Sequence, residues 1–213
     1  MNMTVINKET KLYGSFSLNP GNKGTEYFNK AFEKYNVNAI YKSYFIENIE
    51  DGVNAARVLN FSGFAVAMPY KKTVVPFLDL LDEEAESIGN VNTVVNKKGL
   101  LKGYNTDYLA ICKLFTILKY DKIVVVGDGG LASSLTFFLK KNNIEFYSVT
   151  RRNWDQLKTF NKETIFNCTP VNIDNFNFSS LIDLNIGYVF GDLLHSFQAK
   201  EQFKLYTGIE YDA

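Results

Sequence analysis

Lys71 is the first side chain whose type and position suggest chemistry. It follows a proline at the end of an apolar, strand-like run, in the sequence FAVAMPYKK at residues 64–72. Pro69 ends the strand because its nitrogen carries no proton for a sheet hydrogen bond. Sites in α/β proteins usually lie at the carboxyl edge of the sheet, so we expect Lys71 to face a cleft and Lys72 to face water. A lysine ammonium in that place can donate a proton to a substrate.

Asp107 is a candidate acidic partner. It occurs in GYNTDY (103–108), at the start of a predicted long helix. Asn105 is of a residue type that caps helix N-termini, and the helix dipole favours a carboxylate in the first turn. Because acids are common in first turns, this position fits either a functional or a structural role.

A glycine-rich turn is the third feature. Gly127, Gly129 and Ala132 form a G-x-G-x-x-A pattern, and Gly130 adds a further glycine. The run KIVVV precedes the pattern and LASSLTFFLKK follows it. The pattern therefore lies between a strand and a helix, where backbone amides and the helix N-terminus can bind a pyrophosphate. The alternative is a tight strand-to-helix turn that binds nothing.

The residues after the next strand indicate which nucleotide would bind. Dinucleotide-binding folds that take NAD usually carry an acid there, which holds the ribose hydroxyls. This chain has Thr150, Arg151 and Arg152 instead, and arginine can bind a 2′-phosphate through paired hydrogen bonds. We therefore expect NADP, unless the basic pair only caps a strand. Asp128 would repel the pyrophosphate unless its side chain points to solvent.

The composition argues against several other classes of protein. The chain has 213 residues, 46% of them hydrophobic, and 23 basic residues balance 23 acidic ones. No basic stripe suggests nucleic acid, and no apolar run approaches the ~18 residues of a membrane helix. With one histidine, His195, and the distant cysteines Cys112 and Cys168, we expect no metal site. We expect a cytoplasmic protein with reduced thiols, either a monomer or a homodimer.

The segments that must position these residues alternate between strand-like and helix-like patterns. This alternation predicts an α/β fold with a largely parallel sheet, divided near residues 118–121. The expected strands lie at 11–18, 38–46, 62–68, within 91–105, within 121–152, at 163–170 and at 186–192, and the expected helices at 24–36, 49–60, 108–119 and 131–141.

Six segments resemble, in order and spacing, motifs of the shikimate dehydrogenase family. The resemblance covers nearly the whole chain. GFAVAMPYK (63–71) is similar to the family's G-x-N-V-T-I-P-F-K, IGNVNT (88–93) to I-G-A-V-N-T, LKGYNTD (101–107) to L-x-G-Y-N-T-D, VVGDGGLA (125–132) to the G-A-G-G-A turn, FNCTPV (166–171) to N-A-T-P-x-G, and QAKEQFKLYTG (198–208) to Q-G-A-x-x-F-x-x-W-T-G.

The resemblance implies an N-terminal substrate-binding α/β domain (1–118 with 196–213), a shortened Rossmann-type NADP-binding domain (119–195) and a cleft between them. It implies a reversible, NADP-dependent reduction of 3-dehydroshikimate to shikimate. In this reaction Lys71 would donate and accept the proton, with Asp107 as its partner. The remaining residues that it implies are Asn92 and Gln198 for the substrate and Asn167 and Thr169 for the cofactor.

The chain departs from the family where the substrate carboxylate would bind. The family's two serines fall on Asn22 and Gly24, and its proline falls on Thr25. The sequence PGNKGT resembles instead a divergent subgroup, the shikimate dehydrogenase-like proteins. We expect Asn22 and Thr25 to bind the carboxylate, with Ser15 and Ser17 as a second option.

Two alternative functions follow from the other departures. Ala67 replaces a threonine of the family, which favours an oxidoreductase of the divergent subgroup acting on quinate or another hydroxy acid. Asp128 and Asn172 depart from the family near the nucleotide, which would suit a nucleotide-binding protein without catalysis.

Overall fold

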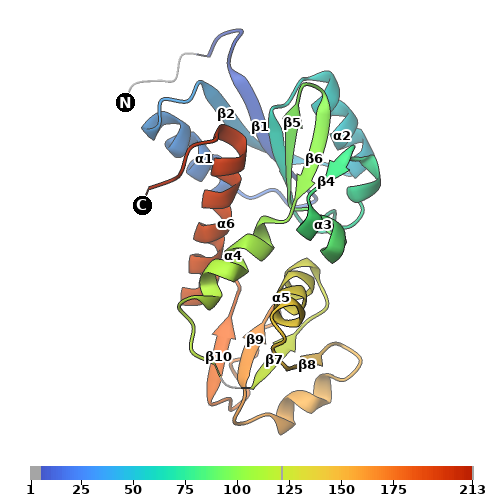
Figure 1. Ribbon diagram of the computed structural model, residues 1–213, viewed down its shortest axis with the longest axis vertical. Coiled ribbons are helices and arrows are strands. Elements are labelled where there is room, and N and C mark those ends of the chain that lie inside the picture. Colours follow the sequence, from blue (N-terminus) through green and yellow to red (C-terminus); the bar gives the residue numbers. More distant parts are fainter. Residues whose placement is uncertain (1–5, 121, 213) are drawn as a thin grey trace. The chain divides into compact units, whose positions relative to one another are not determined.

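The chain forms two compact units, each with its own sheet (Figure 1). The structure is a computed structural model that describes residues 6–120 and 122–212. Unit 1 runs to Thr106 and resumes at Ala199, and unit 2 runs from Asp107 to Gln198. The predicted domain boundaries at 118/119 and 195/196 stay a prediction.

Unit 1 alternates strands and helices through its first half. Its elements are β1 (Lys11–Ser17), α1 (Lys23–Lys34), β2 (Ala39–Phe45), α2 (Ile49–Val58), β3 (Gly63–Val66), the 3-10 turn η1 (Val75–Phe77), β4 (Leu80–Leu81), α3 (Glu83–Ile88), β5 (Thr93–Lys97) and β6 (Leu100–Tyr104).

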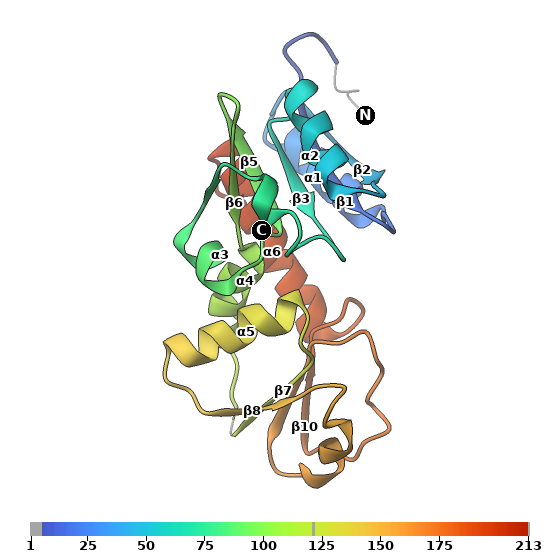
Figure 2. The same cartoon turned by 90° about the vertical axis from the view of Figure 1, so that its right-hand side faces the viewer.

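The sheet of unit 1 has the strand order β2-β1-β3-β5-β6-β4. Strand β1 pairs in parallel with β2 and β3, whereas β5 runs antiparallel to β3 and β6. One face packs against α2 and α3 in a core that includes Phe16, Phe64 and Val53. The other face packs against α1 and the end of the last helix, through Phe28 and Phe203 (Figure 2).

Helix α1 also covers the outer edge of the sheet. Strand β2 is an edge strand, so its outward N–H and C=O groups need partners other than a neighbouring strand. Asn29 of α1 supplies them: its Oδ1 accepts from Tyr41 N at 2.9 Å, and its Nδ2 donates to Tyr41 O at 2.8 Å. The Asn29 amide therefore takes the place of a paired strand.

Unit 2 contains the glycine-rich turn. Its elements are α4 (Thr106–Phe115), which begins at the unit boundary, β7 (Ile123–Val126), α5 (Gly130–Lys141), β8 (Phe146–Val149), the 3-10 helix η2 (Trp154–Thr159), β9 (Thr164–Asn167), β10 (Ser180–Asp183) and α6 (Val189–Thr207), which continues into unit 1.

The sheet of unit 2 is parallel, with the order β10-β9-β7-β8. One face packs against α4, α5 and the first turns of α6. The other face is covered by η2 and by the phenylalanine-rich segment that contains Phe176 and Phe178. The predicted α/β fold and the strand–glycine turn–helix–strand order are confirmed.

The expected strand at 186–192 is wrong, because α6 starts within that segment. The strand that pairs with β9 is β10, which ends at Asp183. Gly187, with φ +101, then turns the chain, and its N–H donates to Oδ1 of Asp192 in the first turn of α6. The apolar residues of this segment therefore pack as part of a helix.

No helix in the two described stretches combines the length and the apolar character needed to cross a membrane. Within the same residues, no three side chains from His, Cys, Asp and Glu gather as a metal site would require.

Asn29→Ala tests the role of α1 at the sheet edge. We expect it to lower the free energy of unfolding by about 2 kcal/mol, because the buried backbone groups of Tyr41 lose their partners. Urea unfolding followed by circular dichroism measures this. Lys30→Ala, an exposed neighbour on α1, is the control and should stay within about 0.5 kcal/mol of the wild type. Equal stability of the two variants would contradict this role.

Candidate functional site

The turn that carries Lys71 is held by its neighbours. The hydroxyl of the buried Tyr70 donates to the carbonyls of Ile46 and Glu47, at 2.7 and 2.8 Å. The carbonyl of Lys71 accepts from Val91 N at 2.8 Å. The side chain of Lys71 is half-buried and that of Lys72 is exposed, as expected for Lys72.

Asn92, the residue after Val91, connects the end of β3 to the start of α4. It precedes β5, and its backbone carbonyl accepts from Val66 N at the end of β3. Its Oδ1 accepts from Thr106 N at 2.8 Å and from Thr106 Oγ1 at 3.0 Å, at the first residue of α4. The Asn92 side chain, just before β5, therefore caps α4, and Asp107 is the residue after Thr106 along the chain.

The Nδ2 group of Asn92 is a buried donor with no hydrogen-bond partner in the described part of the chain. Asn92 is 2% exposed. Its Oδ1 also accepts from Thr93 Oγ1 at 3.0 Å, and these three contacts fix which end of the amide is the acceptor. An unpaired buried donor costs about 1–3 kcal/mol. Such a group fits a site in which a ligand oxygen accepts the hydrogen bond.

Further side chains hold Asn92 and Thr106 in place. Asn105 Nδ2 donates to Asn90 Oδ1 at 2.7 Å, which ties the two segments together a second time. Gln202 of α6 donates to Thr93 Oγ1 at 2.7 Å and to the Asn92 carbonyl at 3.3 Å. Gln198 precedes Gln202 by four residues, so both lie on one face of α6.

The predicted carboxylate-binding residues fall into two groups. Thr25, in the first turn of α1, lies 3.1 Å from Ser43 Oγ, and Ser15 Oγ donates to Ser43 Oγ at 3.0 Å. Ser43, which sequence reasoning missed, therefore brings Thr25 and Ser15 together. Asn22 is exposed and makes no side-chain cap to α1. Ser17 is buried and takes no part in these bonds.

The glycine-rich turn lies between β7 and α5. Gly127 has φ +118, a conformation that side chains other than glycine rarely adopt. Helix α5 starts at Gly130, after the N-cap residue Gly129, which has no side chain to cap the helix. A helix N-terminus that follows such a glycine turn favours an anion. The side chain of Asp128 is exposed, which removes the expected conflict with a pyrophosphate.

The motif after β9 supports this turn. Asn167 uses its whole amide: Nδ2 donates to Val171 O and to Asp183 Oδ2, and Oδ1 accepts from the N–H and the hydroxyl of Thr169. A Cβ on Gly127 would lie 2.9 Å from Thr169 Cγ2. Contacts of Asn167 and Thr169 with a cofactor stay a prediction.

Cys168, between these two residues, is a neutral thiol. Burial raises its pKa well above the ordinary value, and the charge of Asp183 raises it further.

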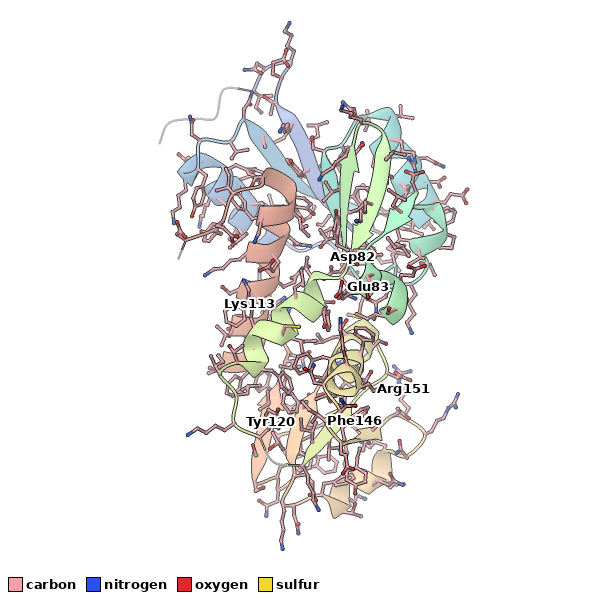
Figure 3. The ribbon with its side chains drawn as sticks, viewed as in Figure 1. Asp82, Glu83, Lys113, Tyr120, Phe146 and Arg151 are labelled. Carbon is pink, nitrogen blue, oxygen red and sulfur yellow. The ribbon has the colours of Figure 1, made fainter. Side chains whose placement is uncertain are left out.

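The basic pair after β8 is presented by a local turn. Asn153 Oδ1 accepts from Thr150 N at 2.7 Å, and Thr150 Oγ1 accepts from Arg152 N at 3.3 Å. Both guanidinium groups are exposed, and Figure 3 labels Arg151. The start of α5, the Gly127 turn and this basic pair together fit a dinucleotide that carries a 2′-phosphate.

Comparisons with known proteins agree with this reading. The shikimate dehydrogenase substrate binding domain family matches residues 22–94. A shikimate dehydrogenase-like protein of Haemophilus influenzae is 40% identical over 152 residues, 70% of this chain and 56% of that protein. The shikimate dehydrogenase (NADP(+)) of Methanococcus maripaludis is 30% identical over 190 residues, 81% of this chain and 68% of that protein.

A solved structure of a shikimate 5-dehydrogenase-like protein matches with a TM-score of 0.82 and 29% identity, covering 98% of this chain and 95% of that one. In sequence, the chain spans about half the length of the first curated relatives that it matches. The fold and the glycine-rich turn define a two-unit α/β protein whose second unit is of the dinucleotide-binding type. The chain belongs to the shikimate dehydrogenase family.

Gly127→Ala tests the turn itself. Positive φ in a non-glycine residue costs of order 1–3 kcal/mol, and the new methyl group would press on Thr169 Cγ2. We therefore expect Gly127→Ala to lower the stability of unit 2 by that amount. Urea unfolding can be followed through Trp154, the one tryptophan of the chain.

Gly129→Ala is the matched control. Gly129 has φ −76, and an added Cβ would meet nothing within 4 Å. This variant should unfold like the wild type. The double variant Gly127→Ala with Thr169→Ser removes the methyl contact and should recover part of the loss. Equal effects of the two alanine variants would contradict the assignment.

Proposed function

We propose that this chain is an NADP-dependent shikimate dehydrogenase, which reversibly reduces 3-dehydroshikimate to shikimate. The observation that carries the proposal is the buried, unpaired Nδ2 of Asn92, whose backbone carbonyl accepts from Val66 N at the end of β3 and whose Oδ1 accepts from Thr106 N at the start of α4. Family membership supports it, and so do relatives that bear the name shikimate dehydrogenase (NADP(+)).

Lys71 would supply the proton of this reaction. When bound, NADPH supplies the hydride that reduces the ketone carbon. The ketone oxygen gains negative charge as the reduction proceeds, and the Lys71 ammonium donates its proton to that oxygen. In the reverse direction, the Lys71 amine takes the proton from the hydroxyl.

Asp107 and Asn92 would orient the reacting groups. Asp107 is 7% exposed, and a buried carboxylate must be paired or hydrogen-bonded. We assign it to hold the ammonium of Lys71 in its charged form. Asn92 Nδ2 would donate to a substrate hydroxyl, and Gln198 would donate to another.

Lys71→Ala tests the proton donor. Loss of a general acid lowers the rate by about 10²–10⁴-fold, so we expect kcat for shikimate oxidation to fall by that factor. The measurement is NADPH absorbance with purified protein, shikimate and NADP. Lys72→Ala, the exposed neighbour, is the control and should retain activity. Loss of activity in both variants, or in neither, would rule Lys71 out as the specific donor.

Arg151→Ala tests the choice of nucleotide. A hydrogen bond to a charged group contributes about 1.5–3 kcal/mol, so kcat/KM for NADP should fall roughly ten- to hundredfold. The value for NAD should change little, because NAD lacks the 2′-phosphate. Lys158→Ala, an exposed cation on η2, is the control. An equal fall in kcat/KM for NADP and for NAD would show that Arg151 does not recognise the 2′-phosphate.

A second candidate function is an oxidoreductase acting on quinate or another hydroxy acid. The replacement of the family's serines by Asn22 and Gly24 and the half-buried Ala67 favour it. A panel of shikimate, quinate and related hydroxy acids separates the two candidates through their kcat/KM values. Nucleotide binding without turnover of any of them would indicate a protein without catalysis.

A further inference from the structure

A row of small and hydroxyl-bearing residues crosses the sheet of unit 1. We call it the polar row: it consists of Ser43, Ser15, Ala65 and Thr93, which pair directly on β2, β1, β3 and β5. Side chains of residues paired in this way point to the same face of a sheet. Thr25 of α1 contacts Ser43, and Gln202 of α6 contacts Thr93. The polar row therefore lies on the face that α1 and α6 cover.

The polar row marks the end of the apolar core on this face. The next row on the same face lies two residues before Ser15 and Ala65 and, because β5 is antiparallel, two residues after Thr93. There Tyr13, Gly63 and Val95 form a closed row, with the Tyr206 ring over Gly63. In the polar row, by contrast, Ser15 and Ala65 are half-buried, although β1 and β3 are interior strands. The protein therefore leaves the middle of this row accessible.

The hydroxyls near this row have one proton more than their mutual bonds require. Ser15 donates to Ser43, and Ser43 shares one further bond with Thr25. These three hydroxyls carry three protons, and two protons serve the two bonds. Thr25 Oγ1 also accepts from Ser43 N at 3.1 Å. Within the described residues, the third proton, on Ser43 or on Thr25, is left to donate to another group.

The neighbouring Tyr41 lies two residues before Ser43 on β2 and therefore on the same face of the sheet. Burial raises the pKa of Tyr41, which therefore stays a neutral phenol.

The charges around Thr25 favour an anionic acceptor. Helix α1 has twelve residues, and no side chain caps its first turn, so its N-terminal N–H groups and dipole favour negative charge. Lys23 adds a positive charge at the same end. Glu26, the acid of the first turn, is exposed and outside the hydroxyl cluster.

We propose that the polar row and Thr25 bind the carboxylate of the substrate, in place of the two serines that the family uses, and that Ser43 determines specificity for this group. The proposal rests on the proposed function, because it assumes a ring hydroxy acid as ligand. The spare hydroxyl proton binds one carboxylate oxygen, and the small, half-buried Ala65 lies between Ser15 and Thr93 in the row. Charged acceptors make hydrogen bonds about twice as strong as neutral ones, so the site prefers the acid to an ester.

Binding of shikimate and of its methyl ester, measured by calorimetry, tests this assignment. Ser43→Ala should weaken shikimate binding about tenfold, equivalent to about 1.4 kcal/mol, and should change ester binding less than twofold. Ser43→Thr keeps the hydroxyl and should retain the preference for the acid. Ser87→Ala removes an exposed serine from α3 and serves as the control. Circular dichroism confirms that each variant is folded.

The outcomes separate this proposal from the proposed function. Ser43→Ala could weaken the binding of shikimate and of its ester equally, or leave both unchanged. If the wild type oxidises shikimate in that case, the carboxylate assignment is wrong and the proposed function stands. If the preference for the acid depends on Ser43 but no turnover occurs, the assignment stands and the function is wrong. If neither shikimate nor quinate binds to the wild type, both proposals are overturned.

Discussion

The bond from Thr106 N to Asn92 Oδ1 is the constraint on which the candidate site depends. The first N–H of α4 needs an acceptor. The acceptor is the side chain of Asn92, which lies fourteen residues earlier, just before β5. This bond fixes the orientation of the amide, and Nδ2 is left buried without a partner within the described residues. The motifs G-N-V-N-T and G-Y-N-T-D therefore form one hydrogen-bonded unit.

Strand register has the same importance for the hydroxyl groups. Ser43 and Ser15 face each other because β1 and β2 pair with Ser15 opposite Ser43. A slip of one residue would turn one of these side chains to the opposite face of the sheet. The Asn29 amide, which binds the backbone of Tyr41, opposes such a slip from the side of α1. The hydrogen bonds of Asn29 to Tyr41 thus also help to fix the position of Ser43 in the polar row, two residues further along β2.

The sequence alone predicts those features that depend on local patterns. The βαβ order around Gly127 follows from an apolar run, glycines and an amphipathic segment close together in the chain. Ser43, Thr93 and Gln202 were missed because their importance comes from pairing and packing between distant segments, although the spacing of Gln202 from Gln198 was a usable signal. The segment 186–192 was assigned as a strand because a short apolar run is equally compatible with a buried helix.

The two units use asparagine in opposite ways. Asn167 uses both Nδ2 protons and both sides of Oδ1 in hydrogen bonds within unit 2. Asn92 has an equally occupied oxygen, but its Nδ2 is buried without a partner. Both lie in motifs that resemble those of the family, so the resemblance alone does not distinguish them. The hydrogen-bond balance does: within the described residues the Asn167 amide is saturated, whereas Asn92 keeps a buried donor that fits a ligand oxygen.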